Sequence, residues 1–255
     1  MNVSVGGPLT ADQCDVLIAG AGLPGLALAA ALVRQGLKVA LADRAPAEVE
    51  DLDHETWDAR VYAVSPGSVA FLDSLGAWAS LPQDRLAAVE SMRVEGDESA
   101  VMTFSAYELG ERALAWIVEE RELRAALLRE VLDAGVNVLA PGAFARLVFT
   151  PDTATLALED GRAVETKLVV GADGVRSWIR QAAGIVANPR PYGQTAVVAN
   201  FACERPHRGC ARQWFRADGG VLAWLPLLEQ RISIVWSASQ APCEDARAFR
   251  WRRGW

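Results

Sequence analysis

The G-x-G-x-x-G segment at residues 20–25, which reads Gly-Ala-Gly-Leu-Pro-Gly, most strongly constrains the fold of this chain. The apolar residues 14–19 before it predict a buried parallel strand, and the Ala- and Leu-rich residues 26–33 after it predict a helix. Residues 38–42 predict a second strand, which ends at Asp43. A glycine pattern alone is a weak signal, but a complete strand–turn–helix–strand unit followed by an acidic residue predicts a dinucleotide site.

The residues of this turn have separate physical tasks. Gly20 permits the tight turn, Gly22 lets the backbone approach a pyrophosphate, and Gly25 lets the helix pack closely on the strand. Leu23 and Pro24 complete the turn before the helix, whose free N–H groups and positive dipole end attract phosphates. The acidic residue after the second strand can accept hydrogen bonds from ribose hydroxyls. The predicted dinucleotide-binding residues are therefore Gly20, Gly22, Leu23, Pro24, Gly25 and Asp43.

The uncharged run of residues 16–33 has a length at which a membrane span must be considered. A signal peptide would need a basic region before this run, but the first basic residue is Arg34, and Asp12 and Asp15 precede the run. The glycine turn also interrupts the run where a strand must change to a helix. We therefore expect a strand followed by a helix here, and no transmembrane segment.

Composition limits the function classes. The 255 residues are 51% hydrophobic, which allows a substantial core and one or two domains. The formal net charge of −7 argues against a nucleic-acid-binding surface. The four cysteines lack C-x-x-C spacing, so we expect reduced thiols in a cytoplasmic protein. His207 lies between Cys203 and Cys210, but a fourth Cys or His is not close in sequence, so we expect no metal site.

Later segments continue the alternation of helical and extended patterns. Apolar residues at four-residue spacing predict an amphipathic helix at residues 121–135, and residues 136–139 predict a strand that completes a second β-α-β alternation. Residues 143–170 predict a three-stranded meander. From residue 197 onward the pattern is extended and aromatic, which predicts a separate and largely antiparallel sheet.

A second constellation follows the last strand of the meander. The residues 171–174, Gly-Ala-Asp-Gly, place a carboxylate at the carboxyl end of a strand and just before a helix. Cofactor phosphates and riboses bind at such positions in open α/β sheets. The alternative is an ordinary Asp-Gly turn in which Asp173 caps the next helix. The residues alone leave both interpretations open.

Together these segments carry a resemblance to a known family. The chain resembles the flavin-dependent aromatic hydroxylases of the para-hydroxybenzoate hydroxylase superfamily, and within them the ubiquinone-biosynthesis hydroxylases. The resemblance extends from about residue 12 to about residue 240. The matching segments are residues 20–25, 59–65, 117–123, 171–180, 192–200, 225–227 and 233–237.

The resemblance implies roles for further residues. Arg44 would flank the adenosine part of FAD, Arg60 would lie near the flavin and pyrophosphate, and Arg121 would reach the cofactor from the start of its helix. For Arg44 the alternative is a solvated charge, and for Arg60 and Arg121 it is a surface ion pair, such as Arg121 with Glu119 or Glu120. No catalytic side chain is assigned. The expected cofactor-binding residues are Gly20, Gly22, Leu23, Pro24, Gly25, Asp43, Arg44, Arg60, Arg121, Asp173 and Gly174.

The fold implied is α/β, with an FAD/NAD(P)-binding Rossmann-like domain and an inserted and appended antiparallel-sheet substrate domain. We expect the FAD-binding domain to comprise residues 11–80 and 113–185. The substrate-side domain would comprise residues 85–112 and 186–255.

The implied function is that of an FAD-dependent monooxygenase, an oxidoreductase that hydroxylates the aromatic ring of a prenylated ubiquinone precursor with NAD(P)H and dioxygen. Such a substrate is greasy, so a peripheral position at the inner membrane, or membership of a quinone-biosynthesis complex, stays open beside a cytoplasmic location. An NAD-linked dehydrogenase is a weaker alternative, because no His or Lys is evidently placed for proton transfer.

The chain departs from the family in one respect. Family members usually continue further and carry a third motif, a Gly-Asp followed by an Ala-rich, His-containing stretch, which this chain lacks, and residues 248–255 do not resemble family sequence. The resemblance therefore implies a C-terminally truncated hydroxylase with weaker FAD retention. The alternative function is a catalytically silent flavin-fold subunit for binding or assembly.

Overall fold

The structure of the chain is a computed structural model that describes residues 12–49, 56–96 and 100–239. The C-terminal residues 248–255, which were expected to depart from the family pattern, lie outside the described residues. The chain separates into two compact units, and each is described by itself. Unit 1 comprises residues 1–51, 72–79 and 124–188, and unit 2 comprises residues 52–71, 80–123 and 189–255.

The domain boundaries expected from the sequence differ from this division in two long segments, and also at residue 80 and residues 186–188. Residues 52–71 and 113–123 are expected in the FAD-binding domain, whereas they belong to unit 2. The assignment of these two segments to the FAD-binding domain stays a prediction.

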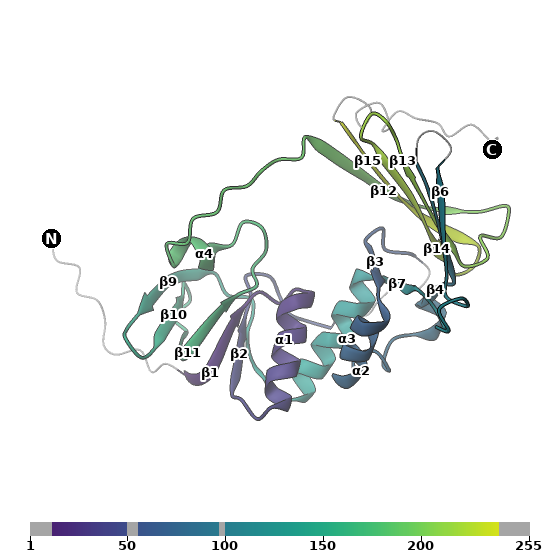
Figure 1. Ribbon diagram of the computed structural model, residues 1–255. Coiled ribbons are helices and arrows are strands. Elements are labelled where there is room, and N and C mark those ends of the chain that lie inside the picture. The colour runs from purple at the N-terminus through teal and green to yellow at the C-terminus, as the bar shows by residue number, and fades with distance from the viewer. Residues whose placement is uncertain (1–11, 50–55, 97–99, 240–255) are drawn as a thin grey trace. The chain divides into compact units, whose positions relative to one another are not determined.

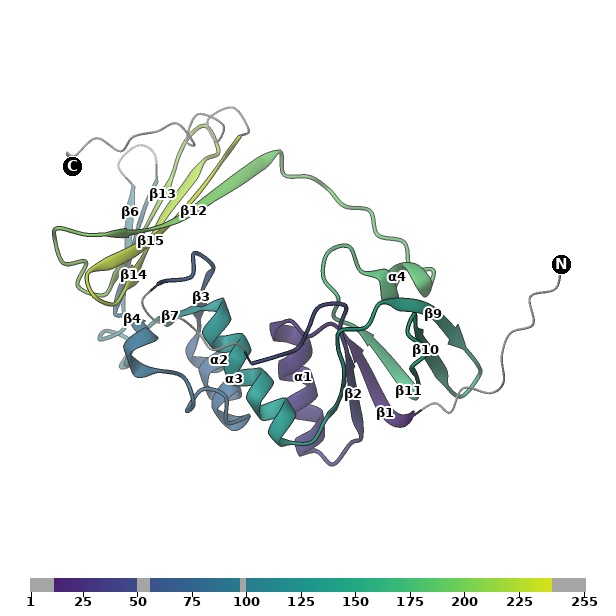
Figure 2. The same cartoon turned by 180° about the vertical axis from the view of Figure 1, so that it is seen from behind.

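Unit 1 is built on a six-stranded sheet with the order β8-β2-β1-β11-β10-β9 (Figure 1). Its first four strands run parallel, and the last two extend the sheet as an antiparallel meander. Figure 2 shows the meander at one edge of this sheet from behind. In sheet order the strands are β8 (Asn137–Leu139), β2 (Val39–Ala42), β1 (Asp12–Ala19), β11 (Ala163–Gly171), β10 (Ala154–Leu158) and β9 (Phe144–Phe149).

The uncharged run divides as predicted into β1 and the helix α1 (Leu23–Arg34). The last four residues of β1 are fully buried, as expected of a strand covered on both faces. The helix begins earlier than residue 26 because Pro24, which has no N–H group, fits the first turn of a helix. No helix in the described part of the chain is long and apolar enough to cross a bilayer.

Three further α-helices occur in the part of the chain that the structure describes. The helices α2 (Pro66–Ser74) and α3 (Glu120–Asp133) each contain a boundary between the units, and α4 (Trp178–Ala182) packs against β11 and β9 in unit 1. The helix α3 occupies the position predicted from its four-residue apolar spacing. Its apolar residues Leu127, Leu128 and Val131 are fully buried.

Unit 2 contains a second six-stranded sheet, with the order β12-β15-β14-β13-β5-β6. All its neighbours are antiparallel except β13 and β5, which pair in parallel and so join two segments far apart in sequence. This confirms the expected α/β class with an inserted and appended antiparallel sheet. Its strands are β12 (Gln194–Ala202), β15 (Arg231–Ser239), β14 (Val221–Leu227), β13 (Cys210–Phe215), β5 (Ser91–Glu95) and β6 (Val101–Ser105).

Unit 2 also contains a small antiparallel sheet, which includes the strand that precedes α3. It consists of β3 (Val61–Val64), β7 (Ala115–Glu119) and β4 (Ala87–Val89), with β7 in the centre. The expected second β-α-β alternation is present along the chain as β7, α3 and β8. Its two strands lie in different sheets, because β7 pairs with β3 and β4 while β8 pairs with β2. The 3₁₀ helix η1 (Gln83–Arg85) and β4 were not predicted, since both are too short to show a period.

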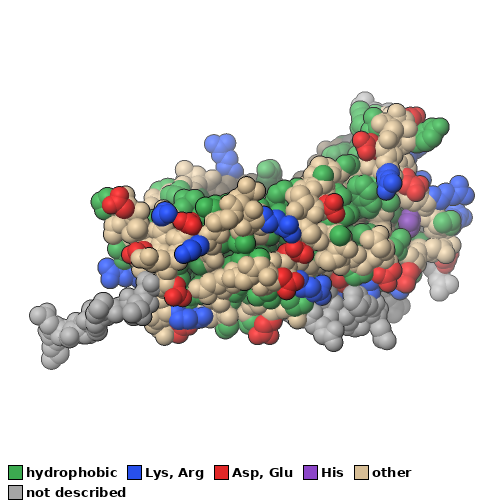
Figure 3. Space-filling model, turned by 90° about the horizontal axis from the view of Figure 1, so that it is seen from below, with side chains coloured by type: hydrophobic (Ala, Val, Ile, Leu, Met, Phe, Trp, Pro, Cys, Tyr) green, Lys and Arg blue, Asp and Glu red, His purple; other side chains and the backbone are tan. Residues whose placement is uncertain are grey.

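Charged side chains are mixed on the face that Figure 3 shows, where acidic and basic groups are interspersed. Elsewhere in the described structure, some oppositely charged side chains form ion pairs with a neighbour in sequence. Arg162 pairs with Asp160, and Arg216 pairs with Asp218. Exposed pairs of this kind contribute little to stability. The buried apolar side chains must therefore provide most of the free energy of folding.

Two leucines of α3 provide a matched test of the unit 1 core. Leu127 is 1% exposed and Leu132 is 42% exposed. We expect Leu127→Ala to lower the free energy of unfolding by about 2–5 kcal/mol through lost burial and a new cavity. Leu132→Ala, the same change on the same helix, should cost less than about 0.5 kcal/mol. Urea unfolding followed by circular dichroism measures both, and equal losses would contradict the helix orientation described.

Candidate functional site

A pocket of about 250 Å³ lies in unit 1, at the carboxyl ends of three neighbouring parallel strands. The strand register places Ala19 at the end of β1 beside both Ala42 of β2 and Gly171 of β11. The turns that follow these strands therefore meet at one edge of the sheet, where open α/β sheets bind ligands. The residues that line the pocket are Gly20, Gly22, Asp43, Arg44, Phe144, Ala172, Asp173 and Gly174.

Two glycines of the turn are required by the protein itself. Gly20 has a φ of 117°, and a Cβ there would overlap the carbonyl oxygen of Ala172. A Cβ at Gly25 would overlap the carbonyl oxygen of Gly20. The tight turn and the close approach of helix to strand, both predicted from the sequence, account for these two positions.

Gly22 differs, because protein packing does not require a glycine there. Its φ of −79° suits any residue, and the nearest atom to a Cβ would be Cδ of Pro24 at 3.9 Å. Gly22 is also the N-cap of α1 and has no side chain that could satisfy the first N–H groups of the helix. Gly22 lines the pocket, so the site fits a phosphate group that needs close backbone approach.

Asp43 fixes the glycine turn to the end of β2. One carboxylate oxygen accepts a hydrogen bond from the N–H of Ala21 at 2.5 Å, and the other accepts one from the N–H of Ala45 at 2.8 Å. A carboxylate has about four acceptor positions, so Asp43 keeps capacity for ribose hydroxyls. Arg44 is exposed and lines the same pocket.

Asp173 caps the helix that follows it, as one of the two sequence-based interpretations proposed. Its carboxylate accepts hydrogen bonds from the N–H groups of Trp178 at 2.6 Å and Ile179 at 3.1 Å, and from the hydroxyl of Ser177. Asp173 and Gly174 also line the pocket, so the cap and the candidate site share one turn. A direct role of Asp173 in cofactor binding stays a prediction.

The two remaining predicted residues, Arg60 and Arg121, belong to unit 2. Arg121 pairs with Glu119 at 3.1 Å, which is the ion pair considered as an alternative, and it also donates to the carbonyl of Thr56. The surface location that this alternative assumed is wrong, because the Glu119 side chain is fully buried. Arg60 is exposed and lines a pocket of about 440 Å³ with Asp58, Ala59, Glu120 and Val198.

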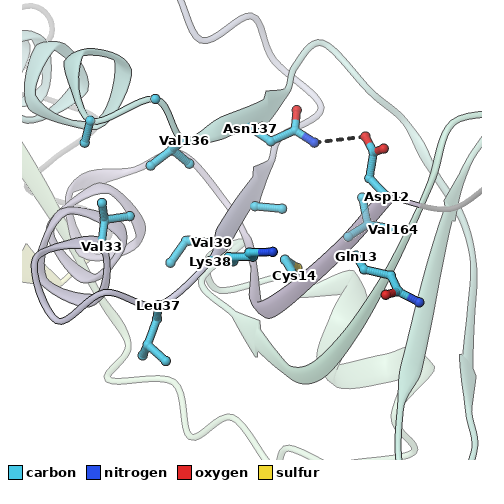
Figure 4. Close-up of a pocket in the computed structure, with 13 residues that line it drawn as sticks. Asp12, Gln13, Cys14, Val33, Leu37, Lys38, Val39, Val136, Asn137 and Val164 are labelled. Carbon is cyan, nitrogen blue, oxygen red and sulfur yellow. Dashed lines mark hydrogen bonds between the residues drawn. The ribbon is translucent and has the colours of Figure 1, made fainter.

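A third pocket, of about 320 Å³, lies at the opposite ends of the unit 1 strands (Figure 4). The side chain of Asn137 donates there to the Asp12 carboxylate at 3.2 Å, and Lys38 and Cys14 also line the pocket. Burial raises the pKa of the Cys14 thiol, so it stays protonated at neutral pH and is a poor nucleophile. The amino ends of parallel strands do not bind cofactors in this architecture, so the smaller glycine-lined pocket is the candidate site.

The His207 side chain is held by two hydrogen bonds. Nε2 of His207 lies 2.7 Å from the carbonyl of Leu227, and its Nδ1 accepts from the N–H of Gly209. Within the described ranges, His, Cys, Asp and Glu side chains form no group that could hold a metal ion.

Comparison with known proteins assigns the family. The sequence pattern of a family described as FAD binding domain matches residues 13–253, nearly the whole chain. The chain belongs to this FAD binding domain family.

Similar proteins include several ubiquinone hydroxylases. The chain is 36% identical to the ubiquinone hydroxylase UbiL of Rhodospirillum rubrum, over 92% of this chain and 54% of the relative. It is 32% identical to the 3-demethoxyubiquinol 3-hydroxylase of Escherichia coli, over 91% of this chain and 59% of the relative. It is 34% identical to the mouse mitochondrial ubiquinone biosynthesis monooxygenase COQ6, over 92% of this chain and 54% of the relative. The chain thus spans about half the length of the curated relatives it matches.

Solved structures support the fold. PqsL of Pseudomonas aeruginosa, in complex with 2-aminobenzoylacetate, matches with a TM-score of 0.75 at 24% identity, over 93% of this chain and 63% of that chain. HpxO of Klebsiella pneumoniae, complexed with FAD and uric acid, matches with a TM-score of 0.68 at 19% identity. The match covers 90% of this chain and 57% of that chain.

The three glycines of the turn predict separable effects of substitution. We expect Gly22→Ala to leave the free energy of unfolding within about 1 kcal/mol of the wild-type value, since only the N-cap preference changes. We expect the same change to weaken FAD binding at least about tenfold, because a methyl group would occupy the path of the phosphates. Gly25→Ala should instead destabilise the fold by several kcal/mol, because backbone atoms must move.

Gly67→Ala is the matched control, because Gly67 lies in α2 with open space around it. It should change neither FAD affinity nor stability by more than about 1 kcal/mol. Thermal unfolding and quenching of FAD fluorescence provide the two measurements. Normal FAD affinity in a folded Gly22→Ala variant would contradict the proposed phosphate approach.

Proposed function

We propose that this chain binds FAD and serves an FAD-dependent monooxygenase that hydroxylates the aromatic ring of a prenylated ubiquinone precursor, with NAD(P)H as reductant. The observation that carries the proposal is the meeting of the glycine turn with Asp43 and Asp173 at one pocket, in a chain of the FAD binding domain family. The names of the relatives support the substrate class, because three of them are hydroxylases or monooxygenases of ubiquinone biosynthesis.

Different residues of the chain would bind different parts of FAD. Backbone N–H groups at the start of α1 would receive the pyrophosphate beside Gly22, and the free acceptor positions of Asp43 would receive ribose hydroxyls. Arg44 would add a positive charge beside the adenosine part. The complete proposed set is Gly20, Gly22, Leu23, Pro24, Gly25, Asp43, Arg44, Arg60, Arg121, Asp173 and Gly174.

FAD, when bound, would carry electrons from NAD(P)H to dioxygen and deliver one oxygen atom to the ring. The protein's own contribution is then to hold and orient the cofactor and to exclude water. This division of tasks explains why a buried nucleophile or a carboxylate pair is not required at the glycine-lined pocket.

The remaining parts of the proposal concern location and partners. We place the protein in the cytoplasm and take its partner to be a small prenylated aromatic molecule rather than a nucleic acid. A greasy substrate favours a peripheral association with the inner membrane or with a quinone-biosynthesis complex. Co-sedimentation with phospholipid vesicles would test the membrane association.

Cofactor choice is the direct test of the proposal. We expect the purified chain to bind FAD in preference to FMN, because the glycine turn and Asp43 match the adenosine and pyrophosphate groups that FMN lacks. We expect a preference over NAD⁺ because the chain belongs to the FAD binding domain family. NAD(P)H should then reduce the bound FAD under anaerobic conditions, which bleaches the flavin absorbance. Tight NAD⁺ binding without FAD binding would identify an NAD-linked protein and overturn the proposal.

The alternative of a catalytically silent subunit makes a different prediction in the same assay. Such a subunit would bind FAD without reduction by NADH or NADPH. Recovery of the ring-hydroxylated quinone precursor in a complemented deletion strain would exclude it. Glutamate substitutions in unit 1 that do not touch the pocket, such as Glu130→Gln, provide a control for both assays.

A further inference from the structure

The strand β6 forms one edge of the six-stranded sheet of unit 2 (Figure 1). It pairs with β5 on one side, and on its other side it has no strand partner among the described residues. Its sequence, Val-Met-Thr-Phe-Ser, contains neither a charged residue nor a proline. Edge strands usually carry a charge or a proline that prevents pairing with another strand, so β6 lacks the common protection against such pairing.

The large apolar side chains of β6 are open to solvent. Val101 is 49% exposed, Met102 is 59% exposed and Phe104 is 39% exposed. The strand at the opposite edge of the sheet, β12, is described along its whole length, and Val198 is its one exposed large apolar side chain. A cluster of exposed apolar side chains marks an interaction surface, and here the cluster lies on β6.

Two backbone hydrogen bonds show which residues of β6 face β5. The N–H of Gly96 donates to the carbonyl of Ala100, and the N–H of Ala106 donates to the carbonyl of Glu90, both at 2.9 Å. The register between the two strands is constant, and successive residues of a strand direct their backbone groups to opposite sides. The even-numbered residues of β6 therefore direct their N–H and C=O groups toward β5.

The odd-numbered residues of β6 direct their backbone groups to the open edge. They are Val101, Thr103 and Ser105, and Thr103 is the middle residue of the strand. An antiparallel copy of the same strand, centred on Thr103, would present its own three odd-numbered residues to this edge. The N–H and C=O groups of the two copies would then match residue by residue.

We propose that β6 pairs with the β6 of a second copy of this chain, as antiparallel strands in which Thr103 lies opposite Thr103. In this register Val101 lies opposite Ser105 of the second copy. A twofold contact of this kind uses the same surface on both copies, so association through β6 stops at two chains. The proposal concerns unit 2 alone and does not depend on the identity of the cofactor.

The side chains favour the same register. Met102 would lie opposite Phe104 of the second copy in a non-hydrogen-bonded pair, where side chains approach most closely, and sulfur–aromatic contacts are favourable. Within one chain, Met102 already lies opposite Val94 and Phe104 opposite Met92. The apolar row of each sheet would therefore continue across the contact into the row of the second copy.

The charges of the region favour a second copy over a lipid surface. A twofold contact brings like charges together, and the strand has none to repel its copy. The exposed Tyr107 and Leu109, which follow β6, could also enter a bilayer. Glu108 and Glu111 lie in the same exposed loop, however, and anionic lipids would repel their carboxylates.

Sedimentation velocity over about 1–500 μM chain is the first test. A strand pair of this length buries less surface than a standard interface of about 1,600 Å², so we expect a dissociation constant of about 1–100 μM. The mass should rise with concentration from 27.4 kDa to about twice that value. A chain that stays monomeric over this range would overturn the proposal, and so would growth beyond the dimer.

A charge exchange at Thr103 tests the register. Thr103→Lys and Thr103→Glu each place like charges opposite one another, and each should raise the dissociation constant about fivefold or more. An equimolar mixture of the two variants should regain dimer, because Lys then lies opposite Glu. The proposal is wrong if the single variants dimerise like wild type, or if the mixture stays monomeric.

Thr195→Lys is the matched control, because Thr195 is an exposed threonine on the opposite edge strand of the same sheet. It should leave the dissociation constant within about twofold of wild type. Loss of the dimer in this variant would place the contact at β12 and contradict the pairing of β6. Circular dichroism of each variant verifies that it is folded.

Thr103→Cys provides a second readout if the charged variants do not fold. The two introduced thiols would lie close together across the contact, so a short bismaleimide should link two chains into a species of about twice 27.4 kDa. Wild type controls for the native cysteines, and Thr195→Cys controls for an exposed thiol elsewhere on the sheet. Equal linkage in Thr103→Cys and Thr195→Cys would refute the proposed contact. A monomeric wild type whose binding to phosphatidylglycerol vesicles is abolished by Met102→Ser would assign the surface to lipid instead.

Discussion

The parallel pairing of β1 with both β2 and β11 is the constraint on which the candidate site depends. It brings three strand ends to one edge, so that the turns after Ala19, Ala42 and Gly171 meet. This pairing in turn depends on glycine, because a Cβ at Gly20 would overlap the backbone after β11. The sheet and the pocket are therefore consequences of the same close approach.

Two carboxylates prepare this edge before any ligand binds. Asp43 accepts from the N–H of Ala21, and Asp173 accepts from two N–H groups at the start of α4. Both turns are thus fixed by interactions within the chain, which lowers the entropy lost when a ligand binds. Gly22, where the protein leaves open space, is the point in this edge at which the proposed ligand, rather than the protein, would require glycine.

Local structure could be predicted from the sequence, whereas long-range pairing could not. The glycine turn, the four-residue spacing of α3 and the meander at residues 143–170 each carry their signal within one short segment. The partners of β7 do not, because β3 and β4 lie far from it in sequence and a strand pattern does not name its neighbour. The same limit explains why the buried Arg85 was missed: it forms an ion pair with Glu119, which lies 34 residues away in sequence.

The two units restrict their sequences in different ways, as the buried Glu119 of unit 2 shows. The pocket of unit 1 uses mainly backbone groups, so its sequence is restricted at glycines and at two strand-end aspartates. The segment 56–58 of unit 2 is held by charged side chains with little access to solvent. Removal of Arg85 would leave Glu119 paired with Arg121, whereas removal of Glu119 would take a carboxylate partner from both arginines at once. The loss of a buried charge that serves two partners is the costlier change, so Glu119 is the more restricted position, although nothing in the local sequence around it shows this.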